Sequence, residues 1–179
     1  MKVSYCCTPN LQQIISAHNS KLQKAKLPKP NPPKLCNCPR NKECPVRGEC
    51  LKSEIVYQAT VEHMNTNHVE TYVGLSSQTF KARLAGHTKS FKHRRYSSDT
   101  TLSAHVWKLR DEGVPFQLTW RIIDRGKAYD YIKKKCDLCI KEKYHIIFRP
   151  KSASLNKRNE LGANCRHKDK TLLKNFSNR

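Results

Sequence analysis

Three stretches of the chain carry apolar residues in the patterns typical of β-strands. Residues 116–123, Phe-Gln-Leu-Thr-Trp-Arg-Ile-Ile, alternate between apolar and polar with a period of two. Residues 54–61 alternate more weakly, and residues 70–76 begin with β-forming side chains and end in glycine, leucine and serine. Alternation of this kind predicts a strand with one face on a core. Only the polar residues 62–69 separate the first two strands, so we expect them to form a hairpin.

Apolar residues at helical spacing predict three helices among these strands. The first is expected to begin at Ser76 or Ser77, where a hydroxyl can accept hydrogen bonds from free amides, and to run through His93. The second covers residues 101–112 and ends at a glycine. The third covers about residues 129–148 and is ended by a proline. The predicted order is strand, strand, helix, helix, strand, helix.

Changes in composition divide the chain into five segments. Residues 1–26 include a short amphipathic helix, and we expect them to connect to a preceding domain. Residues 27–35 are rich in proline and lysine, which predicts an extended basic linker. Residues 36–53 are rich in cysteine. Residues 54–160 hold the predicted strands and the other helices, and residues 161–179 form a return segment with cysteine, histidine and a basic tail.

The charge of the chain indicates a polyanionic partner. There are 35 Lys and Arg residues against 14 Asp and Glu residues, which gives a net charge of +21. Such an excess is far beyond what solubility needs, and each basic side chain near a phosphate releases a condensed counterion. We therefore expect the chain to bind nucleic acid. A membrane is not the expected partner, because no apolar run is long enough to span a bilayer and no clear signal peptide is present.

Candidate chemistry begins with the strand at residues 70–76, which brings Tyr72 to its edge. The helix behind it carries Arg83 and His87, and a separation of four residues places both side chains on one helix face. Residues 78–98 contain six Lys and Arg residues and no acidic residue. A tyrosine, an arginine and a histidine beside a basic surface indicate chemistry on phosphate.

Six residues stand at particular places along the predicted elements: Tyr57, Tyr72, Gly74, Arg83, Glu142 and Asn156. In this order they resemble the GIY-YIG endonucleases. More narrowly, the chain resembles the version at the carboxyl end of Penelope-like retroelement polyproteins, where a cysteine-rich segment precedes the nuclease; the resemblance covers roughly residues 36–170. Ile55 departs from the family pattern, which has glycine there. The element order and the resemblance predict an α+β fold with a small three-stranded antiparallel sheet flanked by helices.

The resemblance implies a phosphodiester hydrolase that cuts DNA with the help of a metal ion. Glu142 would hold a single Mg²⁺ or Mn²⁺, which polarises a phosphoryl oxygen. Arg83 would donate to the phosphate from a planar, permanently charged group. Tyr57 would orient or deprotonate the attacking water, and Tyr72 would hydrogen-bond the phosphate or the water. Asn156 would position the glutamate or the substrate.

The nine cysteines of the chain are grouped at short spacings, and four of them fall within residues 36–50. This segment has almost no large apolar side chain, so burial alone cannot fold it and a cross-link is needed. In a secreted protein the cross-link would be a disulfide. Short cysteine spacings with histidines nearby point instead to structural Zn²⁺ in a reducing, intracellular compartment.

Two sets of zinc ligands fit this segment. One set uses its cysteines alone: Cys36, Cys38, Cys44 and Cys50. The other joins Cys44 and Cys50 to His87 and His93 of the first helix, and it is slightly favoured because it resembles the Cys-Cys-His-His pattern of Penelope-type nucleases. His87 also matches an active-site histidine of some GIY-YIG enzymes. These two roles exclude each other, since a zinc-bound imidazole cannot serve as a base.

A second zinc site is expected where the last helix meets the return segment. Its ligands would be Cys136, Cys139, Cys165 and His167. The alternative is that these cysteines are free and buried, where they behave as small apolar residues. The other histidines of the folded region have no partner identifiable in the sequence: His63, His68, His105 and His145.

The function expected from the resemblance is nicking of double-stranded target DNA, which would prime reverse transcription and integration of a Penelope-like element in the nucleus. The reverse transcriptase domain of the same polyprotein and the element RNA would then be partners. One alternative is a catalytically inactive, zinc-stabilised module that binds nucleic acid. Another is a secreted cationic protein held by disulfides, which would bind no zinc and contain no free thiols.

Overall fold

The computed structural model describes residues 10–26, 34–39, 43–66, 68–130, 132–157, 165 and 167 of the chain. The chain divides into two units, residues 1–33 and residues 34–179. Within the first, helix α1 (Leu11–Lys26) is confirmed. It begins at a reciprocal pair of hydrogen bonds, because Asn10 Oδ1 accepts from the Gln13 amide at 2.9 Å and Gln13 Oε1 accepts from the Asn10 amide at 3.2 Å.

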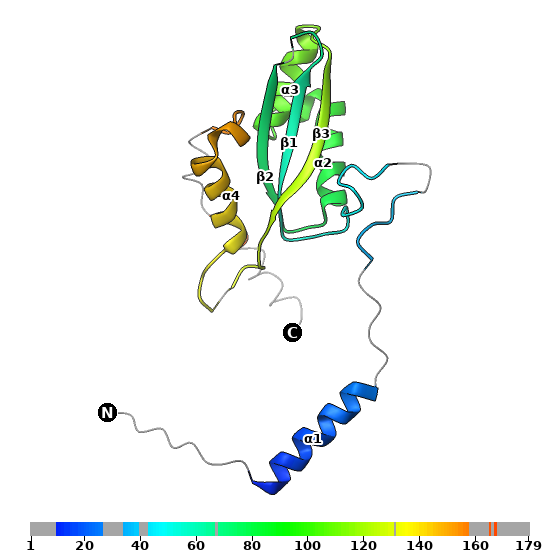
Figure 1. The fold of residues 1–179 in the computed structure, drawn as a ribbon. Coiled ribbons are helices and arrows are strands. Elements are labelled where there is room, and N and C mark those ends of the chain that lie inside the picture. Colours follow the sequence, from blue (N-terminus) through cyan, green and yellow to red (C-terminus); the bar gives the residue numbers. More distant parts are fainter. Residues whose placement is uncertain are drawn as a thin grey trace, which may run out of the picture. The chain divides into compact units, whose positions relative to one another are not determined.

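The second unit is built on an antiparallel sheet of three strands, as predicted (Figure 1). The strands are β1 (Ile55–His63), β2 (Val69–Ser76) and β3 (Phe116–Arg125), in the order β2-β1-β3. The hairpin of β1 and β2 pairs further than expected, because the His63 amide donates to the His68 carbonyl at 2.9 Å. The central strand β1 is almost wholly buried, and Ile55, the departure from the family pattern, is fully enclosed in the core.

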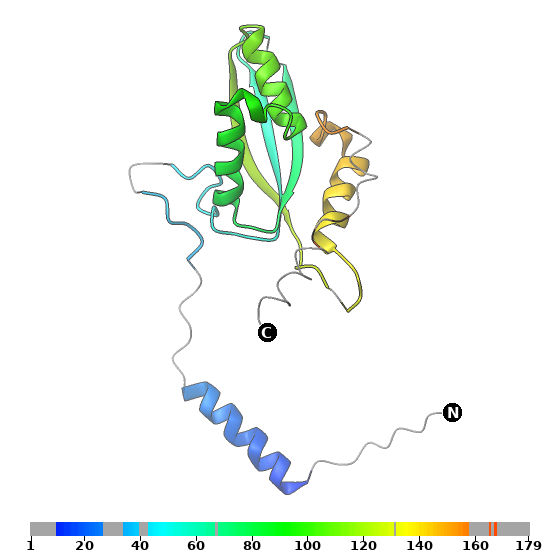
Figure 2. The same ribbon diagram turned by 180° about the vertical axis from the view of Figure 1, so that it is seen from behind.

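Helices cover the sheet on both sides (Figures 1 and 2). Helices α2 (Phe80–Lys92) and α3 (Thr101–Asp111) pack on one face, and α4 (Asp137–Phe148) lies against β2 and β1. The short helices η1 (Arg94–Tyr96) and η2 (Pro150–Ser152) follow α2 and α4. The α+β fold class is thus confirmed.

Two predicted helix starts are wrong. Helix α2 begins after Thr79, whose hydroxyl accepts from the Ala82 amide at 3.3 Å, because Ser76 still belongs to β2. Helix α4 begins only at Asp137 rather than near residue 129. The chain before it turns back on itself, since Asp130 pairs with Lys135 in an isolated β-bridge.

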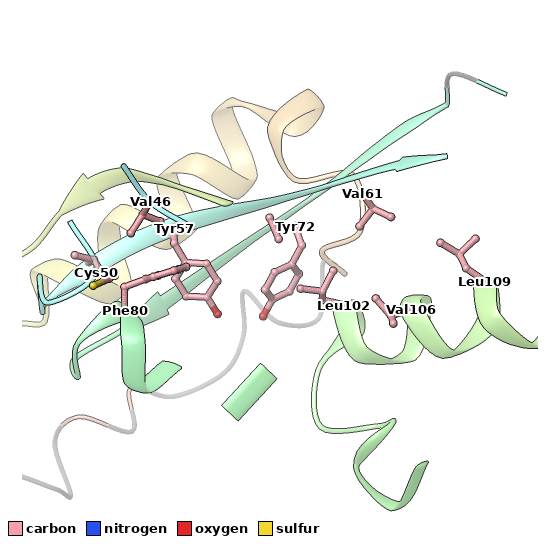
Figure 3. Close-up of a cluster of buried hydrophobic side chains, with 11 residues drawn as sticks. Val46, Cys50, Tyr57, Val61, Tyr72, Phe80, Leu102, Val106 and Leu109 are labelled. Carbon is pink, nitrogen blue, oxygen red and sulfur yellow. The ribbon is translucent and has the colours of Figure 1, made fainter. Parts of the chain in front are cut away.

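Alternation along the strands creates two cores. Tyr57, Ala59 and Val61 point toward α2 and α3, where they join a cluster with Phe80 and Leu102 (Figure 3). The intervening residues face α4, and this second cluster comprises Val56, Val73, Cys136, Leu138 and Ala153. The two faces therefore place the side chains of neighbouring strand residues in different environments.

Candidate functional site

The four cysteines of residues 36–50 converge on one point. The Sγ atoms of Cys36, Cys38, Cys44 and Cys50 all lie within 4.8 Å of one another. Cys50 Sγ is 3.6 Å from Cys36 Sγ and 3.7 Å from Cys38 Sγ. A disulfide would need about 2.05 Å, whereas a tetrahedron of sulfurs around zinc has edges of about 3.8 Å. The spacing therefore fits a structural zinc ion.

Crowding perturbs the thiols of this group. The pKa of Cys38 is raised to about 12, first by its hydrogen bond with Cys36. Burial raises the pKa of Cys44, but hydrogen bonds from the backbone amides of Val46 and Gly48 outweigh it and lower that pKa to about 7. A bound metal ion would displace the protons of these thiols, because zinc binds cysteine as the thiolate. Zinc binding is therefore coupled to deprotonation of the thiols.

The prediction that Cys44 and Cys50 share zinc with His87 and His93 is wrong. His87 is buried against the sheet, where its Nε2 atom lies 2.7 Å from the Tyr57 hydroxyl. His93 is exposed at the carboxyl end of α2. The cysteine group lies at the other end of α2, and with a rise of about 1.5 Å per residue a histidine two turns along the helix cannot reach it. The cysteine-only set is the one that the fold assembles.

The second predicted group is assembled as expected. Ligand atoms of Cys136, Cys139, Cys165 and His167 lie within 4.8 Å of one another. Cys139 Sγ is 3.5 Å from Cys165 Sγ, and His167 Nδ1 is 3.4 Å from Cys139 Sγ. For a tetrahedral zinc the corresponding edges are about 3.6–3.8 Å. Among the described cysteines, none forms a disulfide.

Both cysteine groups lie at the start of a helix. The carbonyls of Lys52 and Cys50 accept from the first amides of α2, Phe80 at 2.9 Å and Lys81 at 2.8 Å, so the cysteine segment satisfies donors that a helix leaves free. Cys136 immediately precedes α4. Metal binding at either group would therefore stabilise the helix that follows.

A buried tyrosine lies at the centre of a second arrangement, between β1 and α2. Arg83 Nε donates to Tyr57 Oη at 2.8 Å, and Tyr57 Oη is 2.7 Å from His87 Nε2. Because a guanidinium can only donate, the tyrosine oxygen accepts from Arg83, whereas the direction of its hydrogen bond with His87 depends on which ring nitrogen of the histidine carries the proton. Arg83 also hydrogen-bonds Tyr72. The sheet and helix thus bring together four of the predicted residues.

Burial controls the protonation of this cluster. It raises the pKa of Tyr57 to about 12, with Arg83 lowering it in part and Glu142 raising it. Burial, and then the charge of Arg83, lower the pKa of His87 to about 3. His87 is therefore neutral at pH 7. Tyr57 is equally held in its neutral form.

Gly74 allows the tyrosine to lie where it does. The register pairs Tyr57 with Gly74 and Ala59 with Tyr72, so the two tyrosines are diagonal neighbours, with ring centroids 6.5 Å apart. Both rings leave the sheet on the same side (Figure 3). A Cβ atom on Gly74 would lie 2.5 Å from Tyr57 Oη and 2.9 Å from Tyr72 Cε1. Only glycine leaves room for both rings.

We expect Gly74→Ala to lower the free energy of unfolding by about 1–3 kcal/mol, because the tyrosine rings are forced out of place. Urea unfolding followed by circular dichroism measures the change. Gly86→Ala is the matched control: its Cβ would meet nothing within 4 Å, on the exposed side of α2. There alanine should stabilise the helix by about 0.5–1 kcal/mol. Equal stability of Gly74→Ala and wild type would contradict the close approach.

The two remaining predicted residues are placed by α4 and the segment after it. Glu142 is half-buried on α4, near enough to Tyr57 for its charge to raise the pKa of that hydroxyl. Asn156 binds the edge strand β2 with both ends of its amide. Its Oδ1 accepts from the Val73 amide and its Nδ2 donates to the Val73 carbonyl, each at 2.8 Å. Asn156 thereby holds the chain that follows η2 on the edge of the sheet.

One group of possible metal ligands was missed at the level of sequence. His63, Glu70 and His105 place a nitrogen or oxygen within 4.8 Å of one another. His63 and Glu70 flank the turn of the β1–β2 hairpin, so their proximity can be expected from the sequence once the hairpin is predicted. His105 comes from α3, and its approach depends on packing alone.

Comparison with protein-family models, curated proteins and solved structures found no match for this chain. The helices that the structure describes are all too short or too polar to cross a bilayer.

Proposed function

We propose that this chain is a metal-dependent DNA endonuclease of the GIY-YIG type, derived from a Penelope-like retroelement. The observation that carries the proposal is the junction at Tyr57 Oη, which accepts from Arg83 Nε and contacts His87 Nε2. Three residues that the resemblance implies are thus bonded to one another. Tyr72 and Gly74 complete the arrangement on the neighbouring strand.

Arg83 is the group best placed to bind a scissile phosphate. Its guanidinium is held by two tyrosine oxygens and is half-buried, so its orientation is set before substrate arrives. A guanidinium has five N–H donors in a rigid plane, which leaves donors for phosphate oxygens. Preorganised charge of this kind stabilises the negative charge that develops on a phosphate in the transition state.

Glu142 is the residue that would hold Mg²⁺ or Mn²⁺. A half-buried carboxylate whose charge acts on Tyr57 suits such a hard cation, which takes oxygen ligands and usually keeps several waters. When bound, the cation would supply a polarised phosphoryl oxygen and an activated water. Glu142 lies on α4, which begins directly after Cys136 and carries Cys139 in its first turn, so its position is linked to the second cysteine group.

Tyr57 is better suited to positioning than to deprotonating water. Its side chain is fully enclosed, its pKa is raised to about 12 by burial, and the pKa of its hydrogen-bond partner His87 is lowered to about 3. A gap of this size opposes transfer of the tyrosine proton to the histidine. We therefore assign Tyr57 and His87 the task of holding Arg83.

The surroundings of α2 support contact with DNA. Lys89, Lys92, Arg94 and Arg95 are all exposed near its carboxyl end, and the net charge of the chain is +21. Basic side chains of this kind bind phosphates without reading the sequence of bases. The priming of reverse transcription, the partner polymerase domain, the element RNA and the nuclear location rest on the resemblance alone.

The second candidate function is a zinc-stabilised nucleic-acid-binding module without catalysis. It is favoured by the complete burial of Tyr57 and by Ile55 at the position of the family glycine. Both candidates predict binding of DNA, so only cleavage distinguishes them.

The experiment is conversion of supercoiled plasmid to nicked circle, with Mg²⁺ and with chelator. We expect nicking by the wild type only with the metal, and a rate about 10–100-fold lower for Arg83→Lys, since an ammonium lacks the planar fork of donors that spans the tyrosine oxygens and a phosphate. Arg121→Lys on β3 is the control, because Arg121 bonds Gln58 on the other face of the sheet. DNA binding without any nicking in Mg²⁺ or Mn²⁺ would establish the binding module instead.

A further inference from the structure

Three side chains meet at the end of the sheet remote from the tyrosine cluster. His63 ends β1, Glu70 lies near the start of β2, and His105 is on α3. Glu70 Oε2 is 3.1 Å from His63 Nε2 and 2.8 Å from His105 Nε2. The side chains of all three are only partly accessible, with 13%, 22% and 13% exposed.

The Nε2 atom of His105 makes an unusual contact. It is sealed from solvent and, among the described residues, makes no hydrogen bond of acceptable geometry, although the Glu70 oxygen lies 2.8 Å away. His63 Nε2 is hydrogen-bonded to the same Glu70 oxygen at 3.1 Å, so the misaligned contact is that of His105. A side chain that is aimed at a shared metal ion, and not at its neighbour, makes a contact of this kind. A buried polar atom without a hydrogen bond is costly, and a metal ion would satisfy it.

We propose that His63, Glu70 and His105 form a third metal site, which takes a divalent transition metal of the Zn²⁺ class. Two imidazoles and one carboxylate are typical zinc ligands, and three protein ligands leave one position for water. The imidazoles disfavour Mg²⁺ and Ca²⁺, which take oxygen ligands. A tetrahedral zinc needs ligand atoms about 3.4 Å apart, so adjustments of a few tenths of an ångström suffice.

The site is separate from the proposed nuclease chemistry and does not depend on it. His63 lies six residues along β1 from Tyr57, which at about 3.3 Å per residue is about 20 Å. A metal ion here would connect the hairpin of β1 and β2 to helix α3, at the end of the sheet that neither cysteine group reaches. Its expected effect is on stability.

The alternative is a metal-free cluster in which a protonated histidine pairs with Glu70. Such a cluster would hold Glu70 by a hydrogen bond from each histidine. Among the described residues only His63 Nε2 makes one, at 3.1 Å, and His105 Nε2 makes none of acceptable geometry.

The zinc content of the protein distinguishes the metal site from the metal-free cluster. The full chain, loaded with Zn²⁺ and freed of excess by gel filtration, is analysed by mass spectrometry of the metal for wild type, His105→Gln and Glu70→Gln. We expect each variant to hold about one zinc ion fewer per chain than the wild type, because the cysteine groups are untouched. His68→Gln is the matched control, since its ring contacts His63 but contributes no atom to the group.

A second readout is the melting temperature with and without added Zn²⁺. Zinc should raise it further in the wild type and in His68→Gln than in Glu70→Gln, where only the cysteine groups bind the metal; this comparison also covers the case in which His105→Gln fails to fold. Equal zinc content and equal zinc response in wild type and Glu70→Gln would overturn the site and leave an ion-pair cluster.

Discussion

Glu142→Ala is expected to abolish magnesium-dependent nicking of plasmid DNA while the protein still binds DNA. The carboxylate would be the protein's contribution to holding the cation, and alanine offers no ligand in its place. We expect the nicking rate to fall by at least about 10³-fold, since the stabilisation of the transition state by the cation is lost. Plasmid nicking measures the rate, and a gel-shift assay in chelator measures binding without cleavage.

The control for this prediction is Glu112→Ala, which removes an exposed carboxylate at the end of α3. It changes the net charge by the same amount and should leave nicking within about twofold of wild type. Nicking that survives in Glu142→Ala would show that the metal is held elsewhere. Loss of both binding and nicking would show that Glu142 maintains the fold.

Removal of zinc from the upstream cysteine group is expected to have the largest effect on stability. Cys50 is buried, its sulfur lies beside Cys36 and Cys38, and its carbonyl accepts from the Lys81 amide at the start of α2. Cys50→Ser should lower the free energy of unfolding by about 4 kcal/mol or more, because a segment that cannot fold by burial loses its cross-link. Thermal unfolding of the zinc-loaded proteins tests this.

Zinc loss should also lower nicking, although no zinc takes part in the proposed reaction. The segment supplies the acceptors for the first amides of α2, and α2 carries Arg83. A strong zinc chelator should reduce nicking in excess Mg²⁺, and Zn²⁺ added back should restore it. Nicking that is indifferent to zinc would contradict the coupling. Thiols that fail to react even in chelator and denaturant would favour disulfides over a metal.

The second cysteine group should stabilise α4 in the same way. Cys136 precedes the helix, Cys139 lies in its first turn, and Glu142 follows one turn later. A rigid metal group at the start of a short helix fixes the direction of the next side chains. In a small α+β domain, the two cysteine groups would thus supply stability that a larger domain gains from its hydrophobic core. Helices α2 and α4, which carry the proposed reactive residues, would depend on them.

Local properties of this protein could be predicted from the order of its residues. Alternation places residues 116–123 in a strand, and the strand pattern on both sides of a short polar stretch predicts the β1–β2 hairpin. The spacing of Cys136 and Cys139 predicts two ligands of a metal site, because ligands on one helical turn lie close together whatever the rest of the fold. The net charge likewise depends on composition alone.

Contacts between distant segments were decided only by the tertiary structure. From the sequence alone, His87 could serve either as a zinc ligand or in the active site, because the order of residues does not fix which distant segments come together. Packing of α2 on the sheet buried His87 against Tyr57 and left the four upstream cysteines to one another. In the same way, α3 brought His105 to the hairpin of His63 and Glu70. The spacing of residues along the chain determines which side chains lie on the same turn of a helix. The packing of helices and strands around a common core determines which of these turns come into contact.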